Sequence, residues 1–152
     1  MWLYDGKPYE PEELDPKVIY GFVYEILDLD NGKKYIGKKF FWRAKTLPIT
    51  KTRKRKKRLK VESDWKTYYG SSEVLKEQVS TRGTDRFERT ILVLCKTKAE
   101  CTYYEAKYQF ERDVLLRDDY YNDWISAKVR RAHLRGLQYE STKQQLSEIR
   151  KE

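Results

Sequence analysis

An Asn-Gly pair between two strand-like runs constrains the fold of this chain more than any other feature. The runs cover residues 18–27 (VIYGFVYEIL) and 33–41 (KKYIGKKFF), and both are rich in β-branched and aromatic residues. Asn31 and Gly32 tolerate the positive φ angles that tight hairpin turns require. We therefore predict an antiparallel hairpin with a two-residue turn at Asn31-Gly32.

This turn fixes which side chains share a face of the hairpin, because cross-strand partners share a face and so do residues two apart. The first face then carries Tyr24, Ile26, Asp28, Tyr35, Gly37 and Lys39, and the second carries Val23, Leu27, Ile36 and Phe40. The second face is the more apolar and the expected core face. A four-residue loop keeps these faces, whereas a one-residue slip exchanges them. The first face is predicted to be a polar platform with a dent at Gly37, although ordinary half-exposed strand tyrosines explain the same pattern.

The remaining segments predict helices around a third strand. Ser71-Ser72 suits a helix N-cap and Gly83 suits a helix end. Residues 87–95 (FERTILVLC) are typical of a buried strand, and residues 98–116 carry a helical apolar stripe. The expected domains are an extended lead-in at 1–17, a main domain at 18–124 with a basic insertion at 43–62, and a charged helical C-terminal arm at 125–152. This order indicates a small α+β domain with a mainly antiparallel sheet.

The positive charge of the chain is concentrated in one segment. Lys and Arg number 33 against 24 Asp and Glu, and eight of the ten residues from 51 to 60 are basic. Such a patch favours a polyanion as partner, nucleic acid first and an anionic membrane second. Because segment 43–62 has no apolar period, we expect a mobile loop there.

The few reactive residues exclude several classes of site. Two cysteines and one histidine cannot complete a Cys/His zinc site, and His133 lies in a basic string that suits neither a Ser-His-Asp triad nor a histidine-based nuclease. Acid–base chemistry would therefore use tyrosines, lysines and carboxylates. No apolar run is long enough to span a membrane and no signal peptide is recognisable, so we expect a cytoplasmic protein with reduced thiols and no membrane partner.

Glu105 is the second unusual residue. On the helix predicted at 98–116 it lies four residues after Cys101 and three before Tyr108, which places it on the apolar side. A carboxylate in that position is paired with a cation or binds a metal. A salt bridge to Lys39 or another base explains the position as well as a metal does.

Several short motifs, taken in order, resemble one known family. They are Val23-Tyr24, Tyr35-Ile36-Gly37, the segment Tyr68-Tyr69-Gly70-Ser71-Ser72, Phe87 with Ile91-Leu92, Glu105 and Tyr121-Asn122. Over residues 18–124 this set is similar to the GIY-YIG nucleases, and most of all to phage members with a basic insertion after the second motif.

The resemblance implies a fold and a chemistry. It implies a three-stranded antiparallel sheet flanked by helices, and hydrolysis of DNA phosphodiesters with one Mg²⁺, for which Mn²⁺ can substitute. It further implies Tyr24 and Tyr35 as the motif tyrosines, Gly37 as the motif glycine, Glu105 as the metal ligand and Asn122 as a supporting polar residue.

Two departures from the family pattern stand out. Phe22 replaces a motif glycine, and the basic insertion takes the place of a helix that carries an Arg followed by a His or Tyr. Tyr68 is the expected substitute for the latter, while Lys39, Lys66 and Arg43 are all candidates for the missing cation. A cation beside a tyrosine is expected to lower the pKa of its phenol, and a cation beside the phosphate stabilises the transition state.

The leading hypothesis is a metal-dependent DNA endonuclease, phage-like and acting in the host cytoplasm if phage-encoded. Its expected contacts to backbone phosphates come from Arg43, Arg53, Lys54, Arg55, Lys56, Lys57 and Arg58. The alternatives are a non-catalytic nucleic-acid-binding module on the same fold and a basic protein that binds another protein. Target specificity, cleavage of RNA and a homodimer all stay open.

Overall fold

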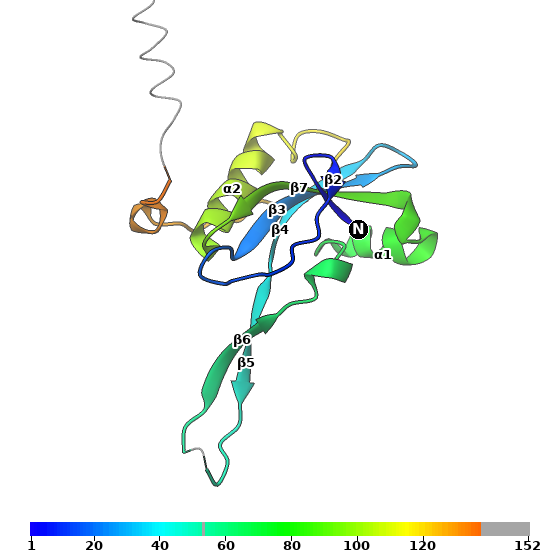
Figure 1. The fold of residues 1–152 in the computed structure, drawn as a ribbon. Coiled ribbons are helices and arrows are strands. Elements are labelled where there is room, and N and C mark those ends of the chain that lie inside the picture. Colours follow the sequence, from blue (N-terminus) through cyan, green and yellow to red (C-terminus); the bar gives the residue numbers. More distant parts are fainter. Residues whose placement is uncertain (53, 138–152) are drawn as a thin grey trace, which may run out of the picture.

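A computed structural model describes residues 1–52 and 54–137 (Figure 1). The strands are β1 (Trp2–Tyr4), β2 (Lys7–Pro8), β3 (Gly21–Asp28), β4 (Lys34–Phe40), β5 (Trp42–Leu47), β6 (Lys57–Glu62) and β7 (Phe87–Cys95). The α-helices are α1 (Glu73–Arg82) and α2 (Lys98–Glu111), and short 3-10 helices lie at Trp65–Thr67, Thr84–Arg86 and Arg131–Leu134. No helix in these two ranges is long and apolar enough to cross a membrane.

The main sheet confirms the α+β class but corrects the number of strands. Its order is β2-β1-β7-β3-β4, so the expected antiparallel trio of β7, β3 and β4 is extended by β1, which runs parallel to β7, and by β2. The predicted three-stranded sheet is therefore too small. The lead-in joins the sheet because the side chain of Trp2 is buried and donates a hydrogen bond from Nε1 to the carbonyl of Trp65, at 2.6 Å.

The β3–β4 hairpin has the predicted faces with a different register. Tyr24 pairs with Gly37 and Ile26 with Tyr35, two residues away from the predicted pairing. The two-residue turn is wrong, and the four-residue alternative at 29–32 is what the structure contains, with the Asp28 amide bonded to the carbonyl of Lys33 at 2.8 Å. A shift by two preserves the period of a strand, so Tyr24, Tyr35 and Lys39 stay on one face.

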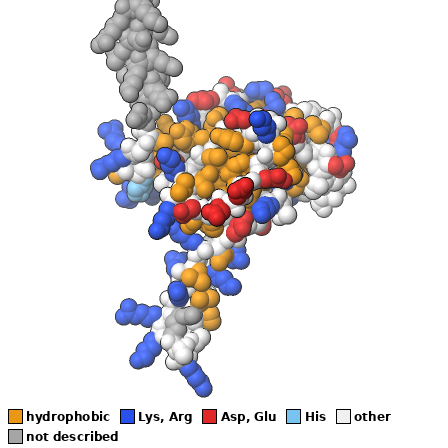
Figure 2. Space-filling view, in the orientation of Figure 1, with side chains coloured by type: hydrophobic (Ala, Val, Ile, Leu, Met, Phe, Trp, Pro, Cys, Tyr) orange, Lys and Arg blue, Asp and Glu red, His pale blue; other side chains and the backbone are white. Residues whose placement is uncertain are grey.

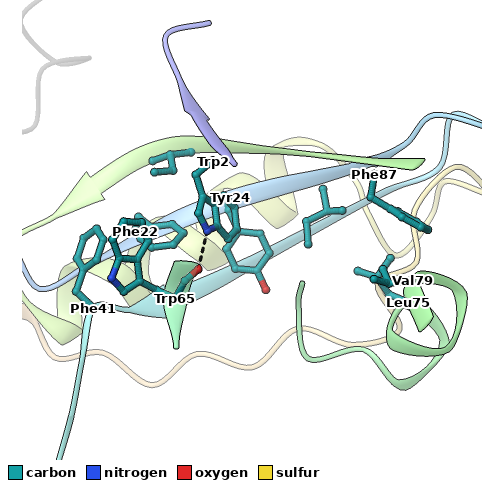
Figure 3. Close-up of a cluster of buried hydrophobic side chains, with 10 residues drawn as sticks. Trp2, Phe22, Tyr24, Phe41, Trp65, Leu75, Val79 and Phe87 are labelled. Carbon is teal, nitrogen blue, oxygen red and sulfur yellow. Dashed lines mark hydrogen bonds between the residues drawn. The ribbon is translucent and has the colours of Figure 1, made fainter. Parts of the chain in front are cut away.

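Both faces of the sheet are covered, which corrects the prediction of a single core face. The second face packs Val23 and Ile36 against Cys101 of α2. The first face, expected to be a polar platform, is an aromatic core instead: Figure 3 shows Trp2, Phe22, Tyr24, Phe41 and Trp65 packed together, with Leu75 and Val79 of α1 nearby. Large rings from distant segments bury the platform because together they remove more apolar area from water than the hairpin could alone.

The basic insertion is a hairpin and not the expected loop. Strands β5 and β6 pair from Trp42 and Glu62 at the base to Leu47 and Lys57 near the tip, in a two-stranded sheet of their own. Figure 1 shows this hairpin projecting away from the main sheet. The strands form because a few apolar residues, Leu59 among them, alternate with the cations at the period of a strand.

The C-terminal part is less helical than predicted. Helix α2 ends at Glu111, five residues before the expected end, although Val114 still reaches the second core. Residues 125–130 have no regular structure, and a 3-10 turn follows at Arg131–Leu134. The rest of the predicted helical arm, residues 138–152, lies outside the described residues.

Candidate active site

A pocket of about 530 Å³ lies where the edge strand β4 meets α2 and the start of α1. Among the predicted site residues, Tyr35, Glu105 and Asn122 line it, together with Lys38, Ser71 and Ser72. Strand β4 is the last strand of the sheet, so side chains from both of its faces can reach round its edge. Residues that alternate along one strand therefore contribute to a single pocket.

Two tyrosines, Tyr24 and Tyr35, flank Gly37 on the first face of the sheet, and Tyr68 packs on Tyr24. The ring centroid of Tyr24 lies 6.2 Å from that of Tyr35 and 6.0 Å from that of Tyr68. A Cβ at position 37 would lie 2.5 Å from the hydroxyl oxygen of Tyr24 and 2.9 Å from Cε1 of Tyr35. The expected common face of Tyr24 and Tyr35 is confirmed, and Gly37 is needed because any side chain there would displace both rings.

Burial raises the pKa of two of these tyrosines. Tyr24 is fully buried, and burial followed by the neighbouring Tyr68 and Tyr35 raises the pKa of its phenol well above the usual value. The pKa of Tyr35 is also raised by burial, which its hydrogen bond to Ser71 Oγ at 2.9 Å partly offsets. Both phenols are therefore protonated near neutral pH.

The hydroxyl group of Tyr24 is an unusual feature of the core. Within the described residues it makes no hydrogen bond of ordinary length, although the atom is buried and the hydroxyl of Tyr68 lies near enough to raise its pKa. A buried polar group without a partner costs stability, by about 1–3 kcal/mol. Such groups in native proteins call for an explanation, and a catalytic role is one of the accepted ones.

The candidate cations occupy different places. Lys39 lies on the tyrosine face, with Nζ 2.6 Å from Asp64 Oδ1 and 4.1 Å from the ring centroid of Tyr68. Lys66 points elsewhere: its side chain is 72% exposed and its Nζ is 3.9 Å from Glu62 Oε1. Arg43 is exposed on β5 and does not line the pocket. Of the three predicted substitutes for the family cation, the structure brings only Lys39 to the tyrosines.

Lys38 is the cation that sequence reasoning missed. Its Nζ lies 3.6 Å from Glu105 Oε1 and donates a hydrogen bond to Thr102 Oγ1 at 3.1 Å. The side chain of Glu105 is only 15% exposed, and Lys38 is the cation that pairs with it. The predicted salt bridge to a base is therefore present, but with Lys38 instead of its neighbour Lys39. Burial raises the pKa of Glu105, and Lys38 opposes that shift. The sequence could have indicated Lys38, because it lies two residues after Ile36 on the same strand. Both side chains therefore belong to the face of the sheet that α2 covers.

Asn122 is held by the backbone of β4. Its Oδ1 accepts from the Ile36 amide at 3.0 Å, and its Nδ2 donates to the Ile36 carbonyl at 2.8 Å. The carbonyl of Ile36 also accepts from Nε2 of Gln109, at 3.0 Å. The side chain of Asn122 therefore fixes residues after α2 against the sheet edge and forms a wall of the pocket.

Glu105 fits a single divalent cation of the Mg²⁺ type. The described residues contain no group of three or more His, Cys, Asp or Glu side chains that could enclose a metal. Mg²⁺ does not require such a group, because it commonly binds one or two carboxylates and takes its other oxygens from water and substrate phosphates. A partly buried carboxylate that lines a pocket supplies the hard oxygen that this ion prefers.

A second, basic cleft adjoins the pocket. It has a volume of about 670 Å³ and lies between the main sheet and the β5–β6 hairpin. Its basic lining residues are Lys38, Lys39, Arg43, Arg58, Lys60 and Lys98, and Asp64 is the one carboxylate among the lining residues. Figure 2 shows Lys and Arg side chains spread over the projecting hairpin. Lys38 lines both hollows, so the positive cleft leads to the pocket of Glu105.

Comparison with known proteins identifies the class. A family model described as "Putative endonuclease segE, GIY-YIG domain" matches residues 2–125, and the chain belongs to this family. The resemblance inferred from the motifs is thereby confirmed. Among curated proteins, "Putative endonuclease segE" of Enterobacteria phage T4 is 30% identical over 104 residues, which make up 68% of this chain and 40% of that relative. The chain thus matches less than half the length of that relative, and no solved structure matches it.

Proposed function

We propose that this protein is a metal-dependent DNA endonuclease that hydrolyses phosphodiester bonds in the pocket at the β4 edge. One observation carries the proposal: Tyr35, Lys38 and Glu105 converge on one pocket at the end of a basic cleft. A phosphate that follows the cleft meets a cation, a carboxylate and a phenol there. Mg²⁺ is the proposed cofactor, with Mn²⁺ able to substitute.

The residues divide the chemistry between them. Glu105 would hold the metal ion, which when bound neutralises the charge that develops on the leaving oxygen. Lys38 neutralises Glu105 in the metal-free site, and its flexible chain allows it to turn towards a phosphate and stabilise the added negative charge. Because Tyr35 is protonated, its hydroxyl orients the attacking water by hydrogen bonding.

The remaining predicted residues support this arrangement. Tyr24 and Tyr68 form the aromatic wall behind Tyr35, and Lys39 covers Tyr68 and binds Asp64. We propose that Arg43 and the basic residues of the hairpin bind backbone phosphates of DNA, in the cytoplasm of the host if the gene is carried by a phage. Arg53, one of the predicted contacts, lies outside the described residues. A homodimer stays a proposal for how a small domain gains specificity.

A non-catalytic nucleic-acid-binding module is the second candidate. The observation that favours it is the ion pair of Lys38 with Glu105, which gives the carboxylate a partner without any metal. A module that has lost cleavage would keep the basic cleft and use Glu105 only to anchor β4 on α2.

A plasmid assay separates the two functions. Supercoiled plasmid is incubated with the wild type, with Glu105→Gln and with Glu111→Gln, in Mg²⁺, in Mn²⁺ and in EDTA. Glu111 is the matched control, because it is exposed on the same helix and does not line the pocket. Nicking that requires the metal and is lost only in Glu105→Gln supports the endonuclease. Retained nicking in Glu105→Gln removes Glu105 from the mechanism, and DNA binding without nicking by the wild type supports the module.

A further inference from the structure

The β5–β6 hairpin is presented to solvent as a ribbon with a fixed base. At the base, Trp42 Nε1 donates to the carbonyl of Ile19 at 3.1 Å, and Ser63 Oγ donates to the carbonyl of Phe40 at 2.6 Å. The amide of Ser63 also donates to the carbonyl of Phe41, at 2.7 Å. These bonds tie both strands to the body, so the hairpin is held in one direction relative to the pocket.

The two faces of the ribbon differ in chemistry. From the register, one face carries Ala44, Thr46, Arg58 and Lys60, with Trp42 and Glu62 at its base, and the other carries Arg43, Lys45, Leu47, Lys57, Leu59 and Val61. We call the first the small-residue face, because the short side chains of β5 stand opposite the long cations of β6. Ala44, Arg58 and Lys60 of this face line the basic cleft with Lys38 and Lys39. Of the other face, Arg43 and Leu59 reach the cleft as well, whereas Lys45 and Lys57 do not.

The ribbon has the dimensions of one groove of DNA. Paired strands lie about 4.8 Å apart, which with side chains gives a width of about 10–12 Å, and six residues span about 20 Å. The major groove of B-DNA is about 12 Å wide and admits a two-stranded ribbon, whereas the minor groove is about 6 Å wide. The major groove of duplex RNA is deep and narrow, so a ribbon of this width does not enter it.

The charges fit the same partner. All five cations of the two strands are exposed, and the only carboxylate in the strands is Glu62 at the base. The centres of interfaces between proteins are depleted of charged residues, so a ribbon with exposed cations along its length does not suit a protein partner. Repeated phosphates on both sides of a groove match a ribbon with cations on both of its faces.

We infer that the β5–β6 ribbon enters the major groove of duplex DNA with its small-residue face towards the base edges. Ala44 and Thr46 leave room for the bases, Arg58 and Lys60 reach hydrogen-bond acceptors such as guanine O6 and N7, and Lys45 and Lys57 contact phosphates. The cleft at the base of the ribbon then leads one DNA strand towards Lys38. This inference rests on the proposed function only in taking DNA as the substrate.

Two double variants of equal charge test the inference. Arg58→Ala with Lys60→Ala alters the small-residue face, and Lys45→Ala with Lys57→Ala removes the same charge from the other face. Both are made in the Glu105→Gln background, so that DNA stays intact, and circular dichroism checks their fold. Binding to a mixed-sequence 30-base-pair duplex is measured by anisotropy, with the same sequence as duplex RNA for comparison. Methylation of guanine N7 by dimethyl sulfate reports contact in the major groove, and netropsin competes for the minor groove.

The expected results distinguish the faces. The parent protein protects guanine N7, binds DNA at least tenfold more tightly than duplex RNA, and is not displaced by netropsin. The small-residue-face variant loses the N7 protection, while the other variant keeps it and lowers the salt dependence by about 0.9 log units per lost phosphate contact. Unprotected N7 in the parent protein, displacement by netropsin, or equal effects of the two variants overturns the inference. Cleavage is scored separately on the wild type, which keeps Glu105. Plasmid cleavage by the wild type without N7 protection by the parent protein refutes the groove contact alone, and N7 protection by the parent protein with no cleavage by the wild type refutes the nuclease alone.

Discussion

Removing the hydroxyl of Tyr24 should stabilise the protein, whereas removing that of Tyr35 should destabilise it. The two residues share one face and one chemistry, and Tyr→Phe deletes the same atom from each. The Tyr24 hydroxyl is buried and makes no hydrogen bond of ordinary length within the described residues, since the Tyr68 hydroxyl is only near enough to affect its pKa. Tyr24→Phe therefore relieves a desolvation cost of about 1–3 kcal/mol. The Tyr35 hydroxyl bonds Ser71 at 2.9 Å, so Tyr35→Phe loses about 0.5–1.5 kcal/mol.

The assay is urea unfolding of the two variants beside the wild type, with thermal unfolding as a second measurement. An unchanged m-value shows that only stability has moved, and each kcal/mol corresponds to about 2–4 °C in Tm for a chain of this size. We expect Tyr24→Phe to unfold at higher urea and to cleave plasmid more slowly. The reason is that a buried hydroxyl which lowers stability is expected to be retained because activity needs it. A loss of stability in Tyr24→Phe as large as that in Tyr35→Phe would show that the hydroxyl has a partner and refute the reasoning.

The remaining predictions concern charge. Lys38→Gln leaves the burial of Glu105 unopposed, so the pKa of that carboxyl rises and the acid limb of the cleavage pH profile moves to higher pH, while Lys38→Arg keeps the wild-type profile. Burial raises the pKa of Asp28, but the hydrogen bonds from Arg82 and Tyr121 together with the Asp30 amide outweigh burial and lower that pKa to about 2. Stability from Asp28, about 2 kcal/mol, is therefore present above pH 4 and lost as the pH falls towards 2, and Asp28→Asn should flatten that limb of acid unfolding. Replacing Lys54, Arg55 and Lys56 together by Gln should weaken binding to all duplex sequences alike and reduce its salt dependence, with little change in turnover at saturating DNA.

Local sequence patterns predicted the elements that depend on near neighbours. The strand at 87–95 has the predicted bounds, and Ser72 caps α1 by accepting from the amide of Leu75 at 3.3 Å. Gly83 ends that helix with a φ of 93°, which its lack of a Cβ permits. These features rest on contacts within a few residues, which the sequence displays directly.

Features that depend on distant segments could not be predicted in the same way. Trp2 draws a polar, proline-containing lead-in into the sheet by packing on Phe22 and bonding the carbonyl of Trp65, which lies 63 residues away. The same packing turns the expected polar platform into a core. The position of Asn122 was predicted from the motif, but its bonds to Ile36 depend on a path round the sheet edge that periodicity does not show.

The backbone of β4 explains why Glu105 lies where it does. Outward-facing backbone groups recur every second residue along an edge strand. Segment 119–122 satisfies two of these positions: Lys34 bonds Asp119 and Tyr121, and Ile36 bonds Asn122. The next outward position is Lys38, where the covering segment has ended, and the backbone amide of Lys38 lies close enough to Glu105 to lower its pKa. Glu105 thus covers the first position of the edge that segment 119–122 leaves open. A carboxylate placed there faces both the amide and the ammonium of one residue, and it opens on the side from which the basic cleft arrives.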